Sequence, residues 1–384
     1  MHSMEPILID DDLQERLDNL TGGVISLCYQ CGVCTAACPW GLVLKETLSI
    51  RNLLRQAQIG LLENNDSLWL CTTCAACQAL CPRGVDIPEV FRSLRQLAWE
   101  RQKPMKGLPS LMWSLYWNGN PWFQPPSQRT GWAKGLEIAE FNPEVHEVLL
   151  YIGCTSSYDR RAQKIAIALI KLLEAADVKF GCLKDDEPCC GESALSLGHK
   201  AYFDEISTRT AEIFHQKGVE KIITISPHCY DVFKNHYPQH CSNLKPMHYT
   251  QYLAYLSESG RLEFPRPLNL KLTFQDPCYL GRLNNEYTAP RTILNAVSGI
   301  ELVEMPASKE DALCCGGGGG RMWLETPAGE RFSDLRVKEA AAVDASILVT
   351  ACPFCIVCLE DSLKVEQIEQ LRVMDIAEVL VNAL

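Results

Sequence analysis

Two short cysteine runs with identical spacing are the strongest chemical signal in this 384-residue chain, which contains 20 cysteines. The runs, CYQCGVCTAACP from Cys28 and CTTCAACQALCP from Cys71, both follow C-x2-C-x2-C-x3-C-P. Three cysteines on a tight loop can wrap one corner of a compact inorganic cube. The fourth cysteine, followed by proline, is directed away to a neighbouring cube. The pattern therefore predicts two [4Fe-4S] clusters.

The exchange of the fourth cysteine between the runs predicts which thiolates share a cluster. Zinc also favours C-x2-C pairs, and two zinc ions would use eight cysteines as well. The third cysteine of each run and the C-P ending favour iron–sulfur over zinc. We predict that one cluster is held by Cys28, Cys31, Cys34 and Cys81, and the other by Cys71, Cys74, Cys77 and Cys38.

The composition and charge of the chain limit the partners and the cellular compartment that we expect for these clusters. The net charge of −11 disfavours a nucleic-acid surface. Disulfide frameworks are typical of short secreted chains, whereas this chain is long and its first 20 residues are acidic, without an apolar signal core. We therefore expect reduced cysteines in the cytoplasm. The longest charge-free stretch, 107–128, is interrupted by Pro, Gly and Asn, so no membrane insertion is expected except through a partner.

The segments around the two runs indicate helices. Leucines fall near one face of 44–60, and Gly60 is a plausible stop, while 87–102 has Pro88 in its first turn. These features predict a mainly helical ferredoxin-like domain over residues 1–103. Trp40, Trp69 and Trp99 are expected to pack around the clusters.

A linker is predicted over 104–145, a stretch rich in Pro, Gly and Trp. Its tryptophans are expected to pack on the next domain, with a partner interface as the alternative. They are Trp113, Trp117, Trp122 and Trp132.

The rest of the chain predicts two copies of one α/β domain. Buried-strand patterns at 146–154, 219–227, 270–278 and 345–353 alternate with helical ones such as 160–178, which indicates mostly parallel sheets. Landmarks in the two halves are separated by nearly constant distances: 124 residues from Cys154 to Cys278, 125 from Cys189 to Cys314, and 126 from Ser226 to Cys352. We predict domains at 146–262 and 263–384, with the cysteines just after strand ends, where open α/β sheets place their sites.

The second copy has the fuller cysteine set: Cys278, Cys314, Cys315, Cys352 and Cys355. Five thiolates are one more than a cubane cluster needs, and an adjacent pair is awkward on one cube face, so an unusual cluster is indicated. The glycines at 316–320 lack a following G-K-S or G-K-T, which disfavours a nucleotide site. They are expected to let the backbone approach a bulky cofactor and donate N–H groups to sulfur. Cys358 is either a reserve ligand or an inert thiol.

The first copy has four cysteines and a serine where the fifth is expected. Its set is Cys154, Cys189, Cys190 and Cys229, with Ser226 aligned to Cys352. Four thiolates suit either a [4Fe-4S] cluster or tetrahedral zinc. His228 is a further candidate ligand, although a non-ligand position beside the site is preferred. Cys182 and Cys241 have no partner pattern and are interpreted as structural.

At this point the chain resembles the CCG-domain iron–sulfur proteins, most closely the heterodisulfide reductase group. CYQCGVCTAACP with LWLCTTCAACQALCPRGVDIPE resembles the ferredoxin-like subunit of that group, whereas CCGE…SPHC and DPCYLGR…CCGGGGG…ACPFC resemble its CCG subunit. The order of the two parts is that of the fused subunit, in which both share one chain. The resemblance implies an α+β multidomain fold, with a helical ferredoxin-like domain for two [4Fe-4S] clusters followed by two tandem α/β CCG repeats.

The same resemblance implies a catalytic noncubane [4Fe-4S] cluster on the five cysteines of the second repeat. In the separate CCG subunit of the group, both repeats have a full set of five cysteines. Ser226 departs from that pattern, so the two-site mechanism of that subunit is not expected here.

Two functions follow from the resemblance, both of them for an oxidoreductase subunit. In the first, electrons from a flavoprotein partner cross the two ferredoxin clusters and reduce a small-molecule disulfide at the C-terminal cluster. In the second, the chain only carries electrons within a larger complex, resembling a flavin dehydrogenase or a benzoyl-CoA reductase. Both require the flavin in another polypeptide, because the chain has no nucleotide fingerprint.

Overall fold

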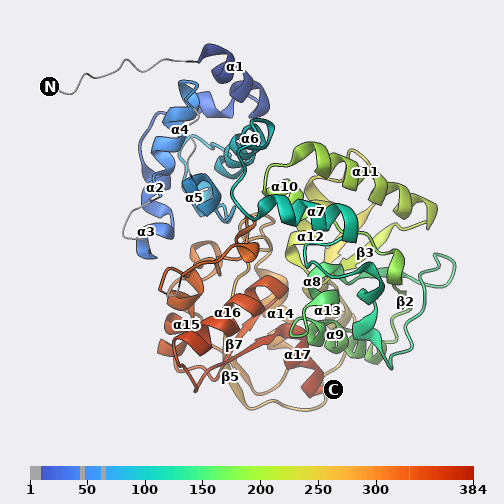
Figure 1. The fold of residues 1–384 in the computed structure, drawn as a ribbon. Helices are drawn as coiled ribbons and strands as arrows, with labels where there is room; N and C mark the ends of the chain where they lie inside the picture. Colours follow the sequence, from blue (N-terminus) through green and yellow to red (C-terminus); the bar gives the residue numbers. More distant parts are fainter. Residues whose placement is uncertain (1–9, 44–47, 62–65, 328) are drawn as a thin grey trace.

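The computed structural model describes residues 10–43, 48–61, 66–327 and 329–384. Figure 1 shows three modules: a helical N-terminal module, drawn in blue, and two α/β modules, drawn mainly in green and in orange to red. The helical module lies against both α/β modules rather than at the end of a tether. This architecture confirms the predicted fold class.

The N-terminal module contains helices and no strand within its described residues. The helix predicted over 87–102 is confirmed as α6, which begins after Asp86, whose carboxylate accepts from the Glu89 N–H at 3.0 Å. The helix predicted over 44–60 forms only from Ile50, after the N-cap Ser49, and residues 44–47 lie outside the described ranges. The helices are α1 (Asp11–Leu20), α2 (Val33–Ala37), α3 (Trp40–Val43), α4 (Ile50–Gln58), α5 (Ala76–Ala79) and α6 (Ile87–Glu100).

The first α/β module is a four-stranded parallel sheet in the order β2-β1-β3-β4. The strands are β1 (Val148–Tyr151), β2 (Phe180–Gly181), β3 (Lys221–Thr224) and β4 (Lys245–His248). The helices are α8 (Gly153–Tyr158), α9 (Gln163–Ala175), α10 (Glu192–Ser196), α11 (Lys200–Gln216), α12 (Pro227–Asn235) and α13 (Tyr249–Glu258).

The second α/β module repeats this topology with the order β6-β5-β7-β8, again all parallel. The identical order confirms the tandem repeat predicted from the spacing of the landmarks. The strands are β5 (Leu270–Gln275), β6 (Ile300–Leu302), β7 (Ile347–Thr350) and β8 (Arg372–Asp375). The helices are α14 (Thr288–Asn295), α15 (Phe332–Ala342), α16 (Pro353–Val365) and α17 (Ile376–Leu380).

The parallel strands determine where the cysteines lie. β1 ends just before Cys154, β5 just before Cys278 and β7 just before Cys352. All carboxyl ends of a parallel sheet meet at one edge, so each repeat gathers its cysteines there. The central strands β1 and β7 are buried along their whole length, as expected for sheets covered on both faces.

The predicted linker contains a helix, α7 (Leu108–Asn118), followed by two short 3-10 turns. Trp132 is buried, and Trp122 donates its indole N–H to Thr155 Oγ1 of the first α/β module at 3.3 Å. Trp113 and Trp117 on α7 are instead 60% and 69% exposed. Packing on the next domain is thus right for two of the four tryptophans and wrong for the α7 pair. In the described part of the chain, none of the helices is long and apolar enough to cross a bilayer.

Candidate iron–sulfur site

The two N-terminal cysteine runs face each other across α2 and α5. Cys38, the fourth cysteine of the first run, lies near Cys71 and Cys74 of the second run. Tyr29 lies beside both Cys31 and Cys81. Cys38 therefore lies by the second run, and Cys81 lies near Tyr29 of the first run. Burial raises the pKa of Cys38 to about 12, so its thiol holds its proton until a metal displaces it.

The backbone of both runs is bent into left-handed turns. Gln30, Thr73 and Ala75 have φ values of 67°, 53° and 59°. Such conformations cost of order 1–3 kcal/mol each and persist where the surroundings impose them. They turn donors toward sulfur: the Thr73 N–H donates to Cys71 Sγ at 3.4 Å, and Gln30 Nε2 donates to Cys28 Sγ at 3.5 Å. Both loops are therefore shaped around thiolates.

The second α/β module brings all five predicted cysteines together in a buried space. Cys278 Sγ lies 3.9 Å from Cys314 Sγ, and Cys355 Sγ lies 3.3 Å from Cys315 Sγ. Cys352 is the N-cap of α16, where the helix terminus favours negative charge. Burial opposes its ionisation, but hydrogen bonds from Cys355 and His228 lower the pKa of Cys352 to about 5. A buried set of five thiols with this electrostatic support fits an anionic metal cluster.

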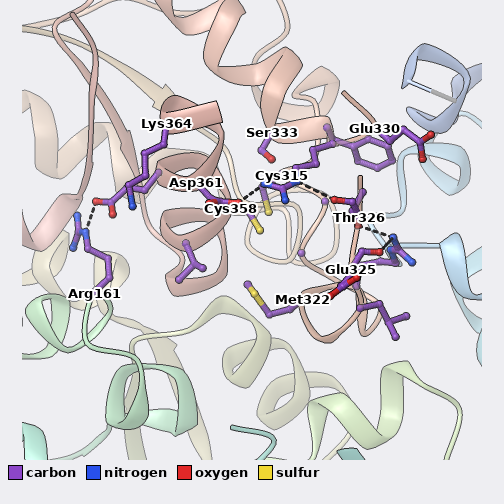
Figure 2. A pocket seen from close by; sticks show the side chains of 18 of the residues that line it. Arg161, Cys315, Met322, Glu325, Thr326, Glu330, Ser333, Cys358, Asp361 and Lys364 are labelled. Carbon is purple, nitrogen blue, oxygen red and sulfur yellow. Dashed lines mark hydrogen bonds and ion pairs between the residues drawn. The ribbon is translucent and has the colours of Figure 1, made fainter. Parts of the chain in front are cut away.

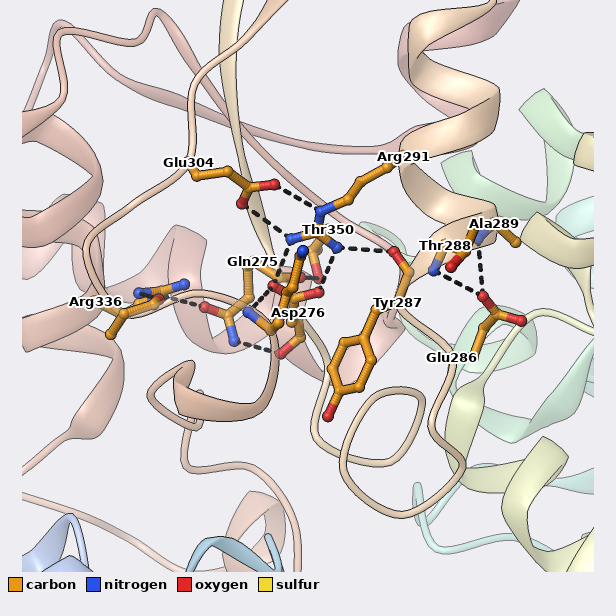
Figure 3. Close-up of polar contacts among 12 residues, drawn as sticks. Gln275, Asp276, Glu286, Tyr287, Thr288, Ala289, Arg291, Glu304, Arg336 and Thr350 are labelled. Atoms are coloured by element: carbon orange, nitrogen blue, oxygen red, sulfur yellow. Dashed lines mark hydrogen bonds and ion pairs between the residues drawn. The ribbon is translucent and has the colours of Figure 1, made fainter. Parts of the chain in front are cut away.

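A polar network fixes the loop ends that carry Cys278 and Cys314 (Figure 3). Asp276 accepts two hydrogen bonds from Arg291, at 2.8 and 3.0 Å, and a third from the Lys309 N–H at 2.8 Å. Gln275 donates to the Leu313 carbonyl at 3.0 Å and accepts from the buried Arg336. These contacts join the end of β5 to the loop that leads into Cys314. They orient ligands without touching the metal space.

The second cysteine run is in direct contact with the second CCG site. Cys74 lies within hydrogen-bonding reach of Cys314. Arg282 donates Nε to the Cys74 carbonyl at 2.7 Å and Nη1 to the Ala312 carbonyl at 2.6 Å. The hydroxyl of Tyr279 lies 2.7 Å from Thr73 Oγ1. These contacts place the two predicted metal sites side by side.

The glycines at 316–320 make two kinds of contact: one with a cysteine sulfur and one with the backbone of the helical module. Gly316 has φ 89° and donates its N–H to Cys314 Sγ at 3.3 Å, which confirms the predicted N–H to sulfur contact. Gly319 serves a purpose that the sequence did not indicate: a Cβ there would lie 2.2 Å from the Cys71 carbonyl oxygen. The absence of side chains thus lets the second CCG repeat approach the ferredoxin run itself.

Arg95 of α6 ties three modules together. It is fully buried and donates to the carbonyls of Cys71 (2.7 Å), Ser196 (2.7 Å) and Gly319 (3.2 Å), besides Leu68. Burial lowers its pKa, because these partners are neutral carbonyls rather than carboxylates.

The first α/β module also gathers its four predicted cysteines. Cys154, Cys189, Cys190 and Cys229 line one small space, close enough for their thiols to interact electrostatically. Arg129, a buried cation from the linker, lies with Nη2 3.5 Å from Cys154 Sγ and forms an ion pair with Glu187 at 3.5 Å. Four thiols with a buried guanidinium fit an anionic centre. In the described ranges, no three His, Cys, Asp or Glu side chains converge on one point closely enough for a single metal ion.

Ser226 and His228 have different roles from those of ligands. Ser226 is the N-cap of α12, and its hydroxyl accepts from the His228 N–H at 3.3 Å. His228 is buried, with Nδ1 3.2 Å from Glu192 Oε1, and it stacks on Tyr279 with centroids 3.8 Å apart. It also lies close enough to Cys352 of the second repeat to favour the thiolate form of that cysteine. Burial alone would lower its pKa, but Glu192 and Cys352 raise it to about 10.

The remaining cysteines lie outside these groups. Cys182 is buried and its backbone pairs with Glu140 and Phe141, whereas Cys241 is half-buried. Cys358 follows Cys355 by one turn of α16 and lines a cavity together with Cys315.

That cavity, of about 420 Å³, leads from the surface to Cys315 and Gly316 (Figure 2). Its wall combines α15 and α16 of the second repeat with Trp40 of the helical module and Arg161 of the first repeat. Its size is within the range of small-molecule sites. The second CCG site is therefore reachable from solvent on the Cys315 side.

Sequence reasoning missed the buried residues that join the modules: Arg95, Arg129, Glu192, Tyr279 and Arg321. An isolated arginine or glutamate has no spacing signal, and its role arises only when distant segments pack together. The DPCYLGR motif did include Tyr279 and Arg282, but only as part of a pattern.

Comparison with known families agrees with this geometry. A 4Fe-4S dicluster domain model matches residues 24–85, and a cysteine-rich (CCG) domain model matches twice, at 148–234 and 272–360. A crystal structure of a hypothetical protein from Helicobacter pylori superposes over 98% of this chain and 73% of its own, with a TM-score of 0.54 at 10% identity, which supports the fold alone.

Curated relatives are iron–sulfur redox proteins. A probable iron–sulfur-binding oxidoreductase of Bacillus subtilis is 39% identical over 71% of this chain and 40% of its own length. An EtfAB:quinone oxidoreductase of Syntrophomonas wolfei is 37% identical over 78% of this chain and 44% of its own length. In Methanosarcina barkeri, the related protein belongs to the dihydromethanophenazine:CoB–CoM heterodisulfide reductase and is 31% identical over 69% of this chain and 65% of its own length.

The chain thus spans less than half of the first two relatives and about two thirds of the third. The dicluster and CCG matches together extend over most of the chain, and they coincide with the modules that carry the cysteines. The chain is a CCG-domain iron–sulfur protein with an N-terminal 4Fe-4S dicluster domain, homologous to a heterodisulfide reductase component.

Proposed function

We propose that this chain is the electron-transferring subunit of an oxidoreductase complex, conducting electrons from a flavoprotein partner to the second CCG site. The observation that carries the proposal is the contact between the second run and the second CCG site, where Arg282 donates to the carbonyls of Cys74 and Ala312 at 2.7 and 2.6 Å. Two metal sites joined through adjacent ligands favour electron transfer from one to the other. The relative named EtfAB:quinone oxidoreductase supports a flavoprotein as the electron donor.

The ligand sets that we propose follow the predicted exchange. Cys28, Cys31, Cys34 and Cys81 would hold one cubane cluster, and Cys71, Cys74, Cys77 and Cys38 the other. Cys278, Cys314, Cys315, Cys352 and Cys355 would hold a noncubane [4Fe-4S] cluster. When bound, that cluster supplies one-electron redox steps at a site that can bind sulfur.

The reaction that we propose at the second CCG site is the reduction of a small-molecule disulfide, RSSR′ + 2 e⁻ + 2 H⁺ → RSH + R′SH. The S–S bond breaks, and both electrons originate from the flavoprotein partner. The cavity that ends at Cys315 supports this step, because it gives a substrate access that a buried carrier would not need. Gly316 and His228 provide donors to Cys314 and Cys352, which would stabilise negative charge on the site.

A second candidate function is electron carriage without disulfide turnover. The relative from Syntrophomonas wolfei favours it, since its name describes electron transfer to a quinone. In that case the second CCG site would pass electrons to a further partner.

For the first CCG site we propose an iron–sulfur centre on Cys154, Cys189, Cys190 and Cys229, with Arg129 balancing its charge. Zinc is the alternative. Stoichiometric zinc after iron reconstitution would support zinc, whereas additional iron and sulfide would support the cluster.

The test is electron paramagnetic resonance of the anaerobically reconstituted, oxidised protein with and without thiol. We expect a thiol-dependent paramagnetic state in the wild type and in the control Cys241→Ser, and its loss in Cys355→Ser. Reduced-cluster signals that do not change when thiol is added would instead identify an electron carrier.

A further inference from the structure

The cavity beside Cys315 contains a buried cation without a carboxylate in ion-pairing contact. Arg321, in the turn that follows the glycine run, is only 6% exposed and lines the cavity together with Cys315 and Gly316. Its Nη2 donates to Thr326 Oγ1 at 2.6 Å and to the Glu325 carbonyl at 3.5 Å. Its buried Nε has no hydrogen-bond partner in the described part of the chain. A buried donor left unmatched is unusual in proteins and indicates an absent partner.

The other arginines of the cavity are already paired. Arg331 pairs with Asp361, and Arg161 pairs with Glu360 and Glu378. Figure 2 shows Arg161 beside Lys364 at one side of the cavity, and Asp361 next to Cys358 and Cys315. The charges of Arg331 and Arg161 are therefore balanced by carboxylates in contact with them. Arg321 interacts with Glu330 only from beyond ion-pairing distance.

The guanidinium of Arg321 is also held in place. Its Cζ lies 5.5 Å from the centroid of the Trp40 ring, which covers one face of the guanidinium plane. The ring covers only a face of the plane and leaves the in-plane donors uncovered. Nη2 already donates to Thr326 and Glu325, whereas Nε has no partner. An in-plane guanidinium donor matches a carboxylate, sulfonate or phosphate. Trp40 itself packs on Phe332 of the second repeat, with centroids 4.6 Å apart, so the helical module supports this wall of the cavity.

We infer that Arg321 is an anion receptor and that the cavity binds a small thiol or disulfide carrying an acidic group, with its sulfur toward Cys315. This inference deepens the proposed function and rests on it for the role of the sulfur. Arg321 would be a specificity-determining residue, since an uncharged thiol would leave its Nε unmatched.

The test separates anion binding from sulfur chemistry. Isothermal titration calorimetry of the reconstituted protein with (methylthio)acetate reports anion binding, because a thioether cannot form a disulfide. We expect wild type to bind (methylthio)acetate at least 10-fold more tightly than the uncharged 2-(methylthio)ethanol. Arg321→Gln should abolish this preference, and Arg331→Gln, at a cation already paired with Asp361, should retain it.

Equal binding of the two thioethers by the wild type would overturn the inference without any variant, so a misfolded Arg321→Gln protein does not block the test. An unchanged preference in a folded Arg321→Gln protein would overturn it as well. The paramagnetic signal of the reconstituted protein is then compared in the presence of mercaptoacetate and of 2-mercaptoethanol. Charge-dependent thioether binding without any thiol signal would keep the anion receptor and reject the disulfide reaction.

Discussion

His228 is the residue through which the first CCG repeat acts on the second. It lies beside Cys229 in sequence, yet its side chain lies 3.2 Å from Glu192 and close enough to Cys352 of the other repeat to favour the thiolate form of that cysteine. Hydrogen bonds to ligand sulfurs raise cluster reduction potentials by stabilising the more negative, reduced state. The repeat that lacks a fifth cysteine therefore supports the repeat that has one.

We predict that His228→Gln lowers the reduction potential of the C-terminal cluster. One hydrogen bond contributes about 0.5–1.5 kcal/mol net, which corresponds to about 20–60 mV for one electron. A redox titration followed by paramagnetic resonance measures the shift. His236→Gln is the control, because His236 faces Asp231 rather than a cysteine. An equal shift in both variants would show that His228 has only a structural role.

At the residue scale, the sequence predicted which cysteines gather far better than the residues that support them. Cysteine spacing is local, so the two ferredoxin runs and the five-cysteine set could be read from the chain. The stacking of His228 on Tyr279 depends on the two repeats packing together, and Arg95 depends on three modules meeting. No local pattern encodes such contacts.

Among the elements, the junction of β8 and α17 contains a buried carboxylic acid. Asp375 is the N-cap of α17, where its carboxylate accepts from the Ala377 N–H at 2.9 Å and from the hydroxyl of Tyr249 in α13 at 2.6 Å. Burial is the main cause that raises the pKa of Asp375 to about 8, and nearby Glu378 adds to it, whereas the two donors oppose it. Protonated Asp375, at the start of α17 in the second repeat, is therefore linked to α13 of the first repeat by the hydrogen bond from Tyr249.

This pKa predicts that stability falls as the pH rises. Between its unfolded pKa of about 4 and the folded value of about 8, the folded chain binds one more proton than the unfolded chain. The free energy of unfolding then decreases by up to about 1.4 kcal/mol per pH unit. Asp375→Asn keeps an N-cap acceptor and should remove this slope, so its melting temperature should exceed that of the wild type by several degrees at pH 8 and by less at pH 6. Thermal melts followed by circular dichroism measure these melting temperatures. The control is Asp344→Asn, because the side chain of Asp344 is 97% exposed. If the melting temperature of Asp375→Asn fell with rising pH as steeply as that of the wild type, the pH dependence could not be assigned to Asp375.

The elements were largely predictable because their signals are periodic and local. The stretches at 146–154 and 345–353 contain short apolar runs, VLLYI and ILV, and form β1 and β7. α7 was missed because Pro109 and the tryptophans indicate a linker, although proline is tolerated in a first helical turn. The sheet order was not predicted, since strand sequences do not specify their neighbours.

At the scale of the whole molecule, the proposed electron transfer requires the three modules to stay in contact. The helical module shares a hydrophobic core with the first repeat and with Tyr279 and Phe332 of the second. Gly318 and Gly319 pack against the backbone of Thr72 and Cys71, so the glycine run sets how closely the metal sites approach.

We predict that Gly319→Ala separates the second repeat from the ferredoxin run. Its φ is 60°, and the new Cβ would lie 2.2 Å from the Cys71 carbonyl oxygen, a backbone atom that cannot rotate away. Gly329→Ala is a matched control: it imposes similar backbone strain at φ 82°, but its Cβ would meet nothing within 4 Å. Hydrogen exchange should therefore increase in Gly319→Ala around Cys71–Cys74 and the 316–321 turn, and remain near the wild-type level there in Gly329→Ala. Electron transfer from the ferredoxin clusters to the C-terminal cluster, followed by rapid-freeze paramagnetic resonance, should slow in Gly319→Ala alone. Equal effects of the two substitutions would mean that backbone strain, rather than the contact between the modules, explains the change.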